Sequence, residues 1–412
     1  MPLTRRQTFR RRRLAVIGVL AVVLGGLGYL AGTGLAPVPE AAASLSQPAA
    51  LTQPAVQLTW PGKGSGAIGA IGYPGLLGSG GEQGTVPIAS ITKMITSLVV
   101  LDKKPLTGKE AGPEITFTDK DVDIYYNVIA ENGSVAPVSA GMVLSQRQTM
   151  EAMLLPSANN YSISLAVWAF GSVDAYLAAA HDWLAAHELA HTAVADTSGL
   201  SPGSRSSPSD LIEIGKLVVA EPALASIVSE RTADLPTIGT VTNTNKLLGK
   251  YGVTGLKTGT TDEAGACLLF SAEFVVGSET VTLVGVVLGG RDHTELNASI
   301  SALIESVKPG FREVTLTDKG AAYATYGTKW GQESRAVAAQ AASVLVWSDT
   351  PVTAVATARP ITLGDVGDTV GAIDFAVGGK IVTVPLVLDK TISDPGPEWR
   401  FSHPGELAAA EQ

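Results

Sequence analysis

The sequence predicts an α+β fold class, with one domain of mixed helices and strands followed by a small β-rich domain. Segments with helical periodicity gather between residues 135 and 220, whereas β-branched and alternating segments lie before residue 90 and after residue 250. Beyond about residue 310, short runs of Val, Thr and Ala are broken by Gly, Pro and Asp, which is typical of short strands joined by turns. The chain of 412 residues is long enough for two such domains.

The amino-terminal end is expected to lie outside both domains. Residues 1–13 hold six arginines, and residues 14–36 follow without a single charged side chain. An apolar stretch of this length can cross a bilayer as a helix, and the positive-inside rule places the arginines in the cytoplasm. Residues 1–13 are therefore interpreted as a cytoplasmic basic segment, and residues 14–36 as a transmembrane signal-anchor.

Export is expected whether or not this helix is retained. Ala41-Ala42-Ala43 would suit a signal peptidase, but the apolar stretch is long for a cleaved signal peptide, which favours a retained anchor. Residues 37–55 are rich in Pro and Ala and are predicted to form an extended linker. The protein is therefore expected at the extracellular face of the cell membrane, or secreted to the cell wall.

The main domain is predicted to comprise residues 56–309. Two strands punctuated by glycine lead as a hairpin to Ser90, and a helix follows over residues 91–101. Further helices are expected over residues 146–155, 161–170, 173–189, 211–219 and 299–307. Strands are expected over residues 253–257, 266–272 and 279–288.

Residues 310–400 are predicted to form the small β-rich domain. Its expected strands cover residues 313–316, 342–347, 352–358 and 380–388. The last residues, 401–412, are short and acidic and are predicted to be a disordered tail.

Charge and cysteine content exclude some functions. The formal net charge is −9 although six arginines lie in the first thirteen residues, so the body of the protein is acidic. Nucleic-acid binding is not expected, because phosphate contacts need clustered Lys and Arg. Cys267 is the only cysteine, lies in an apolar run and is expected in the core, so no internal disulfide forms. No cofactor is expected.

Three short strings indicate the chemistry, and the first is Ser90-Ile-Thr-Lys93. Ser90 and Lys93 are three residues apart at a helix start, so their side chains share a face and can meet. A neutral Lys93, desolvated and close to a second cation such as Lys257, could take the proton of a Ser90 nucleophile. The helix amino terminus adds N–H groups where an oxyanion would form.

The second string, Ser157-Ala-Asn159, lies between two predicted helices. A loop in this place is well suited to face a cleft. Asn159 could hydrogen-bond a substrate amide, and Ser157 could relay a proton to a departing amine. On its own, the string would be interpreted as an ordinary helix cap.

The third string, Lys257-Thr258-Gly259, ends a predicted strand and is followed by Thr260. Lys257 and Thr258 together can bind a terminal carboxylate, and Gly259 lets a substrate lie close to the backbone. The N–H of Thr260 could complete an oxyanion hole with that of Ser90. The three strings in this order predict a serine acyl-transfer enzyme acting on a peptide with a free carboxylate.

From about Trp60 to Val307 the chain resembles the low-molecular-mass penicillin-binding proteins of the serine D-alanyl-D-alanine carboxypeptidase family. The resemblance extends over the segments that flank the three strings, which are Val86-Pro-Ile-Ala-Ser-Ile-Thr-Lys-Met94, Asp196-Thr-Ser-Gly-Leu-Ser-Pro202 with Ser209-Asp-Leu211, and Asn243-Thr-Asn245 with Gly255-Leu-Lys-Thr-Gly-Thr-Thr261. It implies a β-lactamase/transpeptidase-like domain, in which helices flank an antiparallel sheet and form a helical subdomain.

The resemblance implies removal of the terminal D-Ala from peptidoglycan stem peptides. Ser90 would form an acyl-enzyme with the penultimate D-Ala, which water then hydrolyses, and β-lactam antibiotics would be covalent inhibitors. Members of the family are often anchored by a carboxy-terminal amphipathic helix. The tail from Trp399 onward does not show that pattern, so the membrane contact of this chain is expected in residues 14–36.

A zinc protease is a competing interpretation, because His187-Glu-Leu-Ala-His191 matches H-E-x-x-H. The extended three-histidine pattern fails at Val194 and Thr197, and nothing supports Glu213 as a third ligand. The string is interpreted as the exposed end of a helix, and no metal site is predicted.

Two other functions remain open. A class A β-lactamase shares the first and third strings but has S-D-N where this chain has Ala158, and it needs a Glu on the following loop. Residues 196–209 contain no Glu, which argues against rapid antibiotic hydrolysis. A penicillin-binding scaffold that holds wall peptides with little turnover is the other alternative.

Overall fold

The computed structural model describes residues 5–408, which form two compact units. One unit spans Ala55–Arg312, and the other combines the chain before residue 55 with the chain after residue 312. We call the first the catalytic-fold unit and the second the β unit. The main domain that the sequence predicts, residues 56–309, begins one residue after Ala55 and ends three residues before Arg312. Residues 1–4 of the basic segment and 409–412 of the tail lie outside the described residues.

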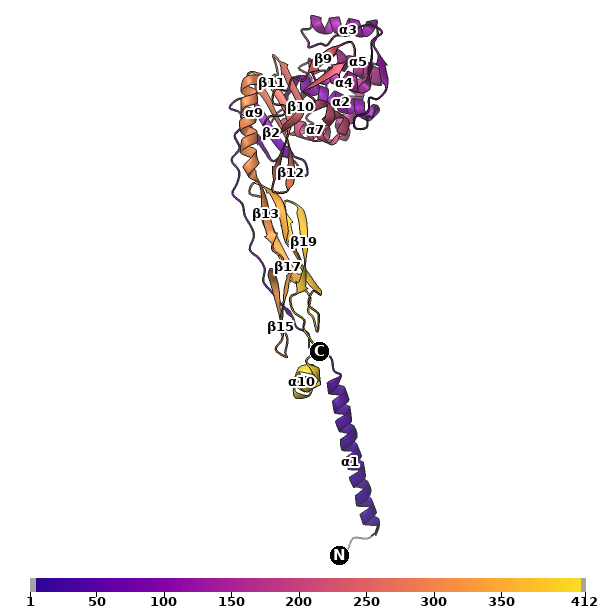
Figure 1. The fold of residues 1–412 in the computed structure, drawn as a ribbon, viewed down its shortest axis with the longest axis vertical. Coiled ribbons are helices and arrows are strands. Elements are labelled where there is room, and N and C mark those ends of the chain that lie inside the picture. The colour runs from indigo at the N-terminus through magenta and orange to yellow at the C-terminus, as the bar shows by residue number, and fades with distance from the viewer. Residues whose placement is uncertain (1–4, 409–412) are drawn as a thin grey trace. The chain divides into compact units, whose positions relative to one another are not determined.

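The catalytic-fold unit is built on a five-stranded antiparallel sheet (Figure 1). Its strands, in spatial order, are β10 (Val253–Thr261), β11 (Gly265–Val276), β12 (Glu279–Gly290), β2 (Ser65–Ala70) and β3 (Gly78–Gly80). Every residue from Ala266 to Ala272 in β11 is buried, which requires cover on both faces of the sheet. Helix α9 (His293–Val307) packs against β11 and β12, and helix α7 (Pro208–Ala220) packs against β2 and β12.

A helical subdomain surrounds helix α2 (Thr92–Lys103). Every α2 residue from Thr92 to Leu101 is buried, so this helix is the centre of the subdomain rather than part of its surface. The other helices are α3 (Asp119–Ala130), α4 (Gln146–Leu154), α5 (Asn159–Phe170), α6 (Val173–Ala186) and α8 (Pro222–Val228). The sequence predicts all of these except α3 and α8. The fold class predicted for the main domain is confirmed.

Three two-stranded ribbons complete the unit, and the sequence predicts none of them. They pair β4 (Val86–Pro87) with β7 (Arg205–Ser206), β5 (Glu114–Thr116) with β6 (Val143–Ser145), and β8 (Thr232–Leu235) with β9 (Gly239–Thr242). Each strand has at most four residues, which is too short for an alternating pattern to stand out.

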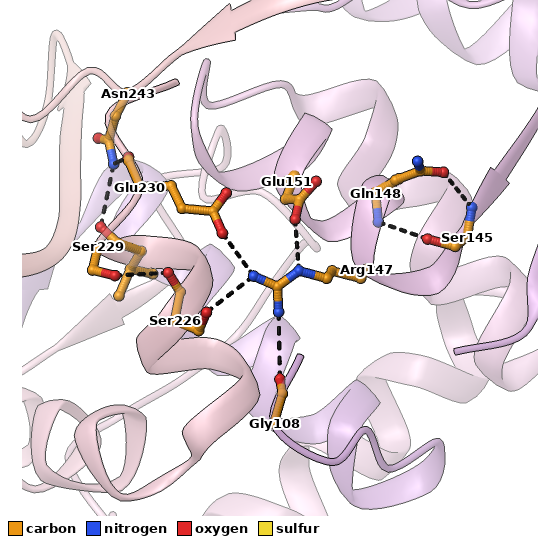
Figure 2. Close-up of polar contacts among 10 residues, drawn as sticks. Gly108, Ser145, Arg147, Gln148, Glu151, Ser226, Ser229, Glu230 and Asn243 are labelled. Carbon is orange, nitrogen blue, oxygen red and sulfur yellow. Dashed lines mark hydrogen bonds and ion pairs between the residues drawn. The ribbon is translucent and has the colours of Figure 1, made fainter. Parts of the chain in front are cut away.

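An ion-pair network holds helix α4 in place, as Figure 2 shows. Arg147 pairs with Glu151 one turn further along α4, at 2.8 Å, and with Glu230 beyond α8, at 2.7 Å. Its guanidinium also donates to the Ser226 hydroxyl and to the carbonyl oxygen of Gly108. Because α4 leads directly to the Ser157 string, this network fixes the helix that carries part of the site.

The β unit contains a six-stranded sheet and a two-stranded ribbon. The sheet order is β1 (Ala43–Leu45), β14 (Ala322–Gly327), β15 (Glu333–Ala338), β19 (Lys380–Leu388), β18 (Thr369–Val377) and β17 (Val352–Ala358). The ribbon pairs β13 (Phe311–Thr317), which begins just before the unit boundary, with β16 (Ala342–Trp347). The sequence predicts β13, β16, β17 and β19 but not β14, β15 or β18.

The linker expected over residues 37–55 is, in part, a strand of the β unit. Ala43 to Leu45 pair with Ala324 to Tyr326 of β14, and the Gln47 side chain both donates to and accepts from the Ala356 backbone. The segment covers an edge strand whose N–H and C=O groups would otherwise be unpaired. The expectation of an extended linker over residues 37–55 is therefore wrong for residues 43–45, which form a strand of the sheet.

The two ends of the described chain also belong to the β unit. Helix α1 (Arg5–Gly34) has an apolar window of mean hydropathy 2.4 and no buried side chain, so its length and composition would allow it to span a membrane. At the other end, α10 (Gly396–Ser402) and α11 (Pro404–Ala408) are helical. The expected disordered tail is therefore wrong for residues 401–408, which lie largely in α10 and α11 and include His403, whose ring stacks on that of Trp399.

Candidate active site

Ser90 lies on a one-turn 3-10 helix, Ala89–Ile91, that leads directly into α2. Its side chain is partly exposed, whereas the residues on either side are buried. Ala89 has a φ of 45°, in the left-handed region that is strained for a residue with a side chain. Gly199 packs against this turn so closely that an added Cβ would lie 1.8 Å from the Ala89 carbonyl oxygen. Ser90 is therefore held on a constrained turn at the amino end of a buried helix.

Lys93 contacts Ser90, as the sequence predicts. Its Nζ donates to the Ser90 Oγ at 2.8 Å, to the Asn159 Oδ1 at 2.7 Å and to the Ser198 carbonyl oxygen at 3.1 Å. Lys93 is fully buried, and no ion pair within residues 5–408 includes it. Burial, reinforced by the nearby charge of Lys257 and opposed by Asp196, holds the pKa of Lys93 well below its usual value. A neutral amine is thus favoured beside the Ser90 hydroxyl.

The second string contributes one direct contact and one neighbour. Asn159 begins α5, and its side-chain oxygen accepts a hydrogen bond from the Lys93 Nζ. The Ser157 hydroxyl is not among the three acceptors of Lys93. Ser157 is buried, with a φ of 65°, in the turn between α4 and α5. The structure therefore brings Asn159 to Lys93, with Ser157 two residues before it on the same turn.

Strand β10, at the edge of the sheet, brings the third string against the nucleophile turn. A Cβ on Gly259 would lie 3.0 Å from the Ile88 carbonyl oxygen and 3.1 Å from the Ser90 nitrogen. Real Cβ contacts are rarely this short, so a larger residue at this position would push the two backbones apart by a few tenths of an ångström. This proximity places the Ser90 N–H beside the end of β10.

Lys257 is a second buried cation near the site. Its Nζ donates to the Thr258 carbonyl oxygen at 3.1 Å, and burial lowers the pKa of Lys257 to about 7. The Thr258 hydroxyl shares a hydrogen bond of 2.6 Å with that of Thr244. Like Lys93, Lys257 has no carboxylate partner among the ion pairs of residues 5–408.

His293 and Asp196 are functional candidates that the sequence reasoning did not single out. The His293 Nε2 lies 2.6 Å from the Thr260 Oγ1, and burial together with Lys257 lowers the pKa of His293 against the pull of Asp292. His293 starts the helix after β12, whose carboxyl end lies at the same sheet end as Thr260. His293 could have been identified by predicting that the strands before Thr260 and before His293 end at the same side of an antiparallel sheet.

Asp196 organises the loop that reaches Lys93 from the other side. Its carboxylate accepts from the backbone N–H groups of Ser198, Gly199 and Leu200 and from the hydroxyls of Ser198 and Ser204. This loop presents the Ser198 carbonyl oxygen to Lys93. The resemblance includes the loop, but the sequence alone does not indicate what its carboxylate does.

A cleft of about 790 Å³ borders these groups. It is lined by the end of α3, the start of α5, the start of α6, the Asp196 loop, and the end of β10 with the turn that follows it. Asn159, Ser198 and Thr260 face it, and four acidic residues lie along its walls: Glu131, Asp196, Asp262 and Glu263. Asn159 and Ser198, which both contact Lys93, connect this cleft to the base beside Ser90.

The H-E-x-x-H string does not have the geometry of a zinc site. Helix α6 ends at Ala186, and Glu188 has a φ of 59°, so His187 and His191 do not share a helix face. The His187 ring stacks on Trp183, and the His191 Nδ1 lies 3.6 Å from the Asp210 Oδ1. The string therefore marks a helix end and the loop after it.

Comparison with known proteins agrees with this geometry. The profile of the family described as D-alanyl-D-alanine carboxypeptidase matches residues 76–292. The D-alanyl-D-alanine carboxypeptidase DacA of Escherichia coli (strain K12) is 28% identical over 252 residues, which are 60% of this chain and 61% of DacA. The chain therefore spans less than two thirds of that relative.

A second relative and a solved structure cover more of the chain. The D-alanyl-D-alanine carboxypeptidase DacC of Escherichia coli (strain K12) is 27% identical over 342 residues, which are 78% of this chain and 82% of DacC. Penicillin-binding protein 5 from Haemophilus influenzae has a similar fold, with a TM-score of 0.57 at 20% identity over 82% of this chain and 98% of that one. Because the family profile covers more than half of the sequence, this chain belongs to the D-alanyl-D-alanine carboxypeptidase family.

Proposed function

We propose that this protein is a serine-type D-Ala-D-Ala carboxypeptidase that removes the terminal D-alanine from peptidoglycan stem peptides. The observation that carries the proposal is the hydrogen bond of 2.8 Å between the Lys93 Nζ and the Ser90 Oγ, made by a fully buried lysine without a carboxylate partner. Burying such a lysine as a cation costs free energy, so the neutral amine is favoured. A neutral amine beside a hydroxyl can act as a base. Family membership supports the choice of substrate.

Acylation begins when the Ser90 Oγ attacks the carbonyl carbon of the penultimate D-Ala and Lys93 takes the hydroxyl proton. The N–H groups of Ser90 and Thr260 stabilise the oxyanion, consistent with the close approach of β10 to the Ser90 turn. The C–N bond then breaks, and the departing amine of the terminal D-Ala receives the proton from Lys93 through Ser157. The product is an ester between Ser90 and the shortened peptide.

The remaining site residues hold the substrate. Asn159 binds a substrate amide while its Oδ1 orients Lys93. The carboxylate of the terminal D-Ala lies against Lys257, Thr258 and Thr260, where a cation and two hydroxyls are available. Gly259 lets the peptide run along the edge of β10 as an added strand.

Deacylation uses the same base. Once the terminal D-Ala has left, Lys93 is neutral again and accepts a proton from water as the water attacks the ester carbonyl. The Ser90–acyl bond breaks, and Ser90 recovers its proton. Covalent inhibition by β-lactam antibiotics follows from the same chemistry, because their strained amide would acylate Ser90 and leave no departing group to diffuse away.

A β-lactamase is the less favoured alternative. The loop over residues 196–209 lacks the glutamate that would activate water, and the carboxylate of Asp196 in that loop is already bonded by three backbone N–H groups and two hydroxyls. A scaffold without turnover is disfavoured by the contact between Lys93 and Ser90.

Anchorage and location are part of the proposal. Helix α1 would cross the cell membrane with its arginines in the cytoplasm and place both units on the extracellular side. The length and hydropathy of α1 support this, and they are also those of a long signal peptide. Peptidoglycan stem peptides would be the substrate within reach of that location.

The experiment is release of D-Ala from a pentapeptide mimic by the full-length protein in detergent. We expect turnover by the wild type and none by Ser90→Ala, with both proteins equally folded. The His191→Ala variant is a matched control outside the site and should retain full activity. Absence of D-Ala release from a protein that still acylates with penicillin would favour the scaffold, and rapid antibiotic turnover would favour the β-lactamase.

A further inference from the structure

One end of the β unit carries apolar side chains that face solvent. Leu35, directly after α1, is 85% exposed, and Val366 and Leu363, in the loop before β18, are 62% and 44% exposed. Scattered apolar residues are ordinary on a protein surface, but a group of large ones at one place marks a contact. We call this part of the molecule the helix-exit end.

Backbone contacts within the β unit bring these residues to the same end. The Ala41 N–H donates to the Ile361 carbonyl oxygen at 2.8 Å, which ties the chain after α1 to the loop that contains Leu363 and Val366. The Ile392 N–H donates to the Gly364 carbonyl oxygen at 2.8 Å, so the chain after β19 runs along the same loop. The helix-exit end is therefore formed by three segments that are distant in sequence.

Aromatic side chains extend this surface. The Trp330 and Trp399 rings are 5.7 Å apart in an edge arrangement, and the Trp330 Nε1 donates to the Ser393 carbonyl oxygen at 3.1 Å. The Phe401 ring, in α10, reaches the end of α1, where it would lie 3.3 Å from a Cβ on Gly34. Its centroid is 6.5 Å from that of Tyr29. Two tryptophans, a tyrosine and a phenylalanine thus gather where the apolar helix ends.

Arg400 fastens α10 to the chain that leaves α1. Its Nε donates to the Ala36 carbonyl oxygen at 3.0 Å, and its guanidinium donates to both carboxylate oxygens of Asp394. The side chain is buried, so the contact is part of the fold of this end rather than a surface encounter. Helix α10 therefore lies beside the end of α1 (Figure 1).

We propose that the helix-exit end of the β unit is seated in the outer surface of the lipid bilayer, at the boundary between head groups and acyl chains. The surface is continuous with the end of an apolar helix, and Trp and Tyr are the side chains that favour this boundary. Two ion pairs lie there, Lys329 with Glu406 and Arg400 with Asp394, and the same segments carry the exposed acidic residues Glu40, Asp365, Asp368 and Glu398, so the lipid that fits this end is zwitterionic rather than anionic. The inference rests on the proposed anchorage by α1.

The test places a nitroxide label at single cysteines of the full-length protein, reconstituted in phosphatidylcholine vesicles. Cys267 is buried and is replaced by alanine, after which Val366→Cys reports the helix-exit end. Ile381→Cys is the matched control, because Ile381 is 71% exposed and lies by the turn at the opposite end of the β18–β19 hairpin. Val22→Cys, in α1, reports the anchor. Collisions with oxygen, which enters lipid, are compared with those of a water-soluble nickel chelate.

We expect the Val366 label to collide at least about threefold more with oxygen relative to nickel than the Ile381 label does. Equal ratios at the two positions, with the Val22 label in lipid, would overturn the inference and leave the anchorage standing. A Val366 label shielded from both reagents and broadened by a neighbouring label would show that a second copy of the chain covers this end instead. A Val22 label exposed to nickel would instead contradict the anchorage.

Discussion

The two units bury cations in opposite ways. In the catalytic-fold unit, Lys93 and Lys257 are buried without a carboxylate partner, and burial lowers the pKa of each. In the β unit, Arg400 is buried but donates to both oxygens of Asp394, and this pairing raises the pKa of Arg400. A paired cation keeps its charge and holds segments together, whereas an unpaired one loses its charge more readily, which suits Lys93 as a base and leaves Lys257 free to bind a substrate carboxylate. The contrast separates a reactive site from a structural one.

The largest expected effect is that of Lys93→Met. Met fills the same buried space without a base, so we expect kcat/KM for D-Ala release to fall by about 10³-fold or more. Thermal unfolding should show the variant at least as stable as the wild type, since a costly desolvation is removed. Activity within a factor of about ten of the wild type would end the assignment of Lys93 as the base.

Gly259→Ala tests the close approach of β10 to the nucleophile turn. The new Cβ would meet the Ile88 carbonyl oxygen at 3.0 Å and the Ser90 nitrogen at 3.1 Å, so the strand must move away. The shift needed is a few tenths of an ångström, and because a misplacement of about 1 Å can cost about 10²-fold, we expect kcat/KM to fall by about tenfold. Steady-state kinetics measures the loss, and Gly327→Ala, at an open position in the β unit, is the control that should change nothing.

The pH dependence of substrate binding tests Lys257. With a pKa of about 7, Lys257 is a cation below that pH and neutral above it, so binding of a carboxylate weakens as the pH rises through 7. We expect kcat/KM to fall by up to tenfold per pH unit on that alkaline side. Lys257→Arg should remove this fall, because arginine stays charged. A wild-type profile that is flat between pH 7 and 9 would count against the role of Lys257.

Lys93 sets the acid side of the same profile. Because burial holds the pKa of Lys93 well below its usual value, the base is free at neutral pH and is lost only as the pH falls through that lowered pKa. Activity should therefore decline toward acid in the wild type and equally in Lys257→Arg.

The smallest effect on catalysis is expected from Asp394→Asn in the β unit. Loss of the charge leaves Arg400 buried and only partly bonded, which should lower the free energy of unfolding of this unit by roughly 2 kcal/mol. Calorimetry of the full-length protein measures the shift. The kcat/KM should stay unchanged, and a large loss of activity would mean that this pair is not merely structural.

Sequence patterns were sufficient to predict secondary structure where apolar side chains recur with a strong helical period. The helices that carry Lys93 and Asn159 are long, apolar on the buried side and free of glycine, so their existence could be predicted to within a few residues. For the same reason, the three strings could be assigned to a helix start, a loop between helices and a strand end. The contact between Lys93 and Ser90 follows from helix geometry alone.

Contacts between distant segments could not be predicted in this way. His293 meets Thr260 only because β10 and β12, the two neighbours of β11, end at the same side of the sheet. Ala43 to Leu45 carry no strong strand pattern and become a strand because β14 offers an unpaired edge. Helix α10 is short and is held by Arg400, whose partner Ala36 lies at the other end of the sequence. Each of these depends on tertiary structure rather than on local propensity.

The most direct test of the account is the mass of the full-length protein after exposure to penicillin. The full-length protein is used because residues 43–45 form a strand of the β unit, and a protein shortened past them would lack that strand. We expect one acyl group per molecule, located on Ser90 by peptide mapping, lasting for many minutes and absent from Ser90→Ala. An unmodified wild-type protein, or an adduct on another residue, would contradict the assignment of Ser90 as the nucleophile.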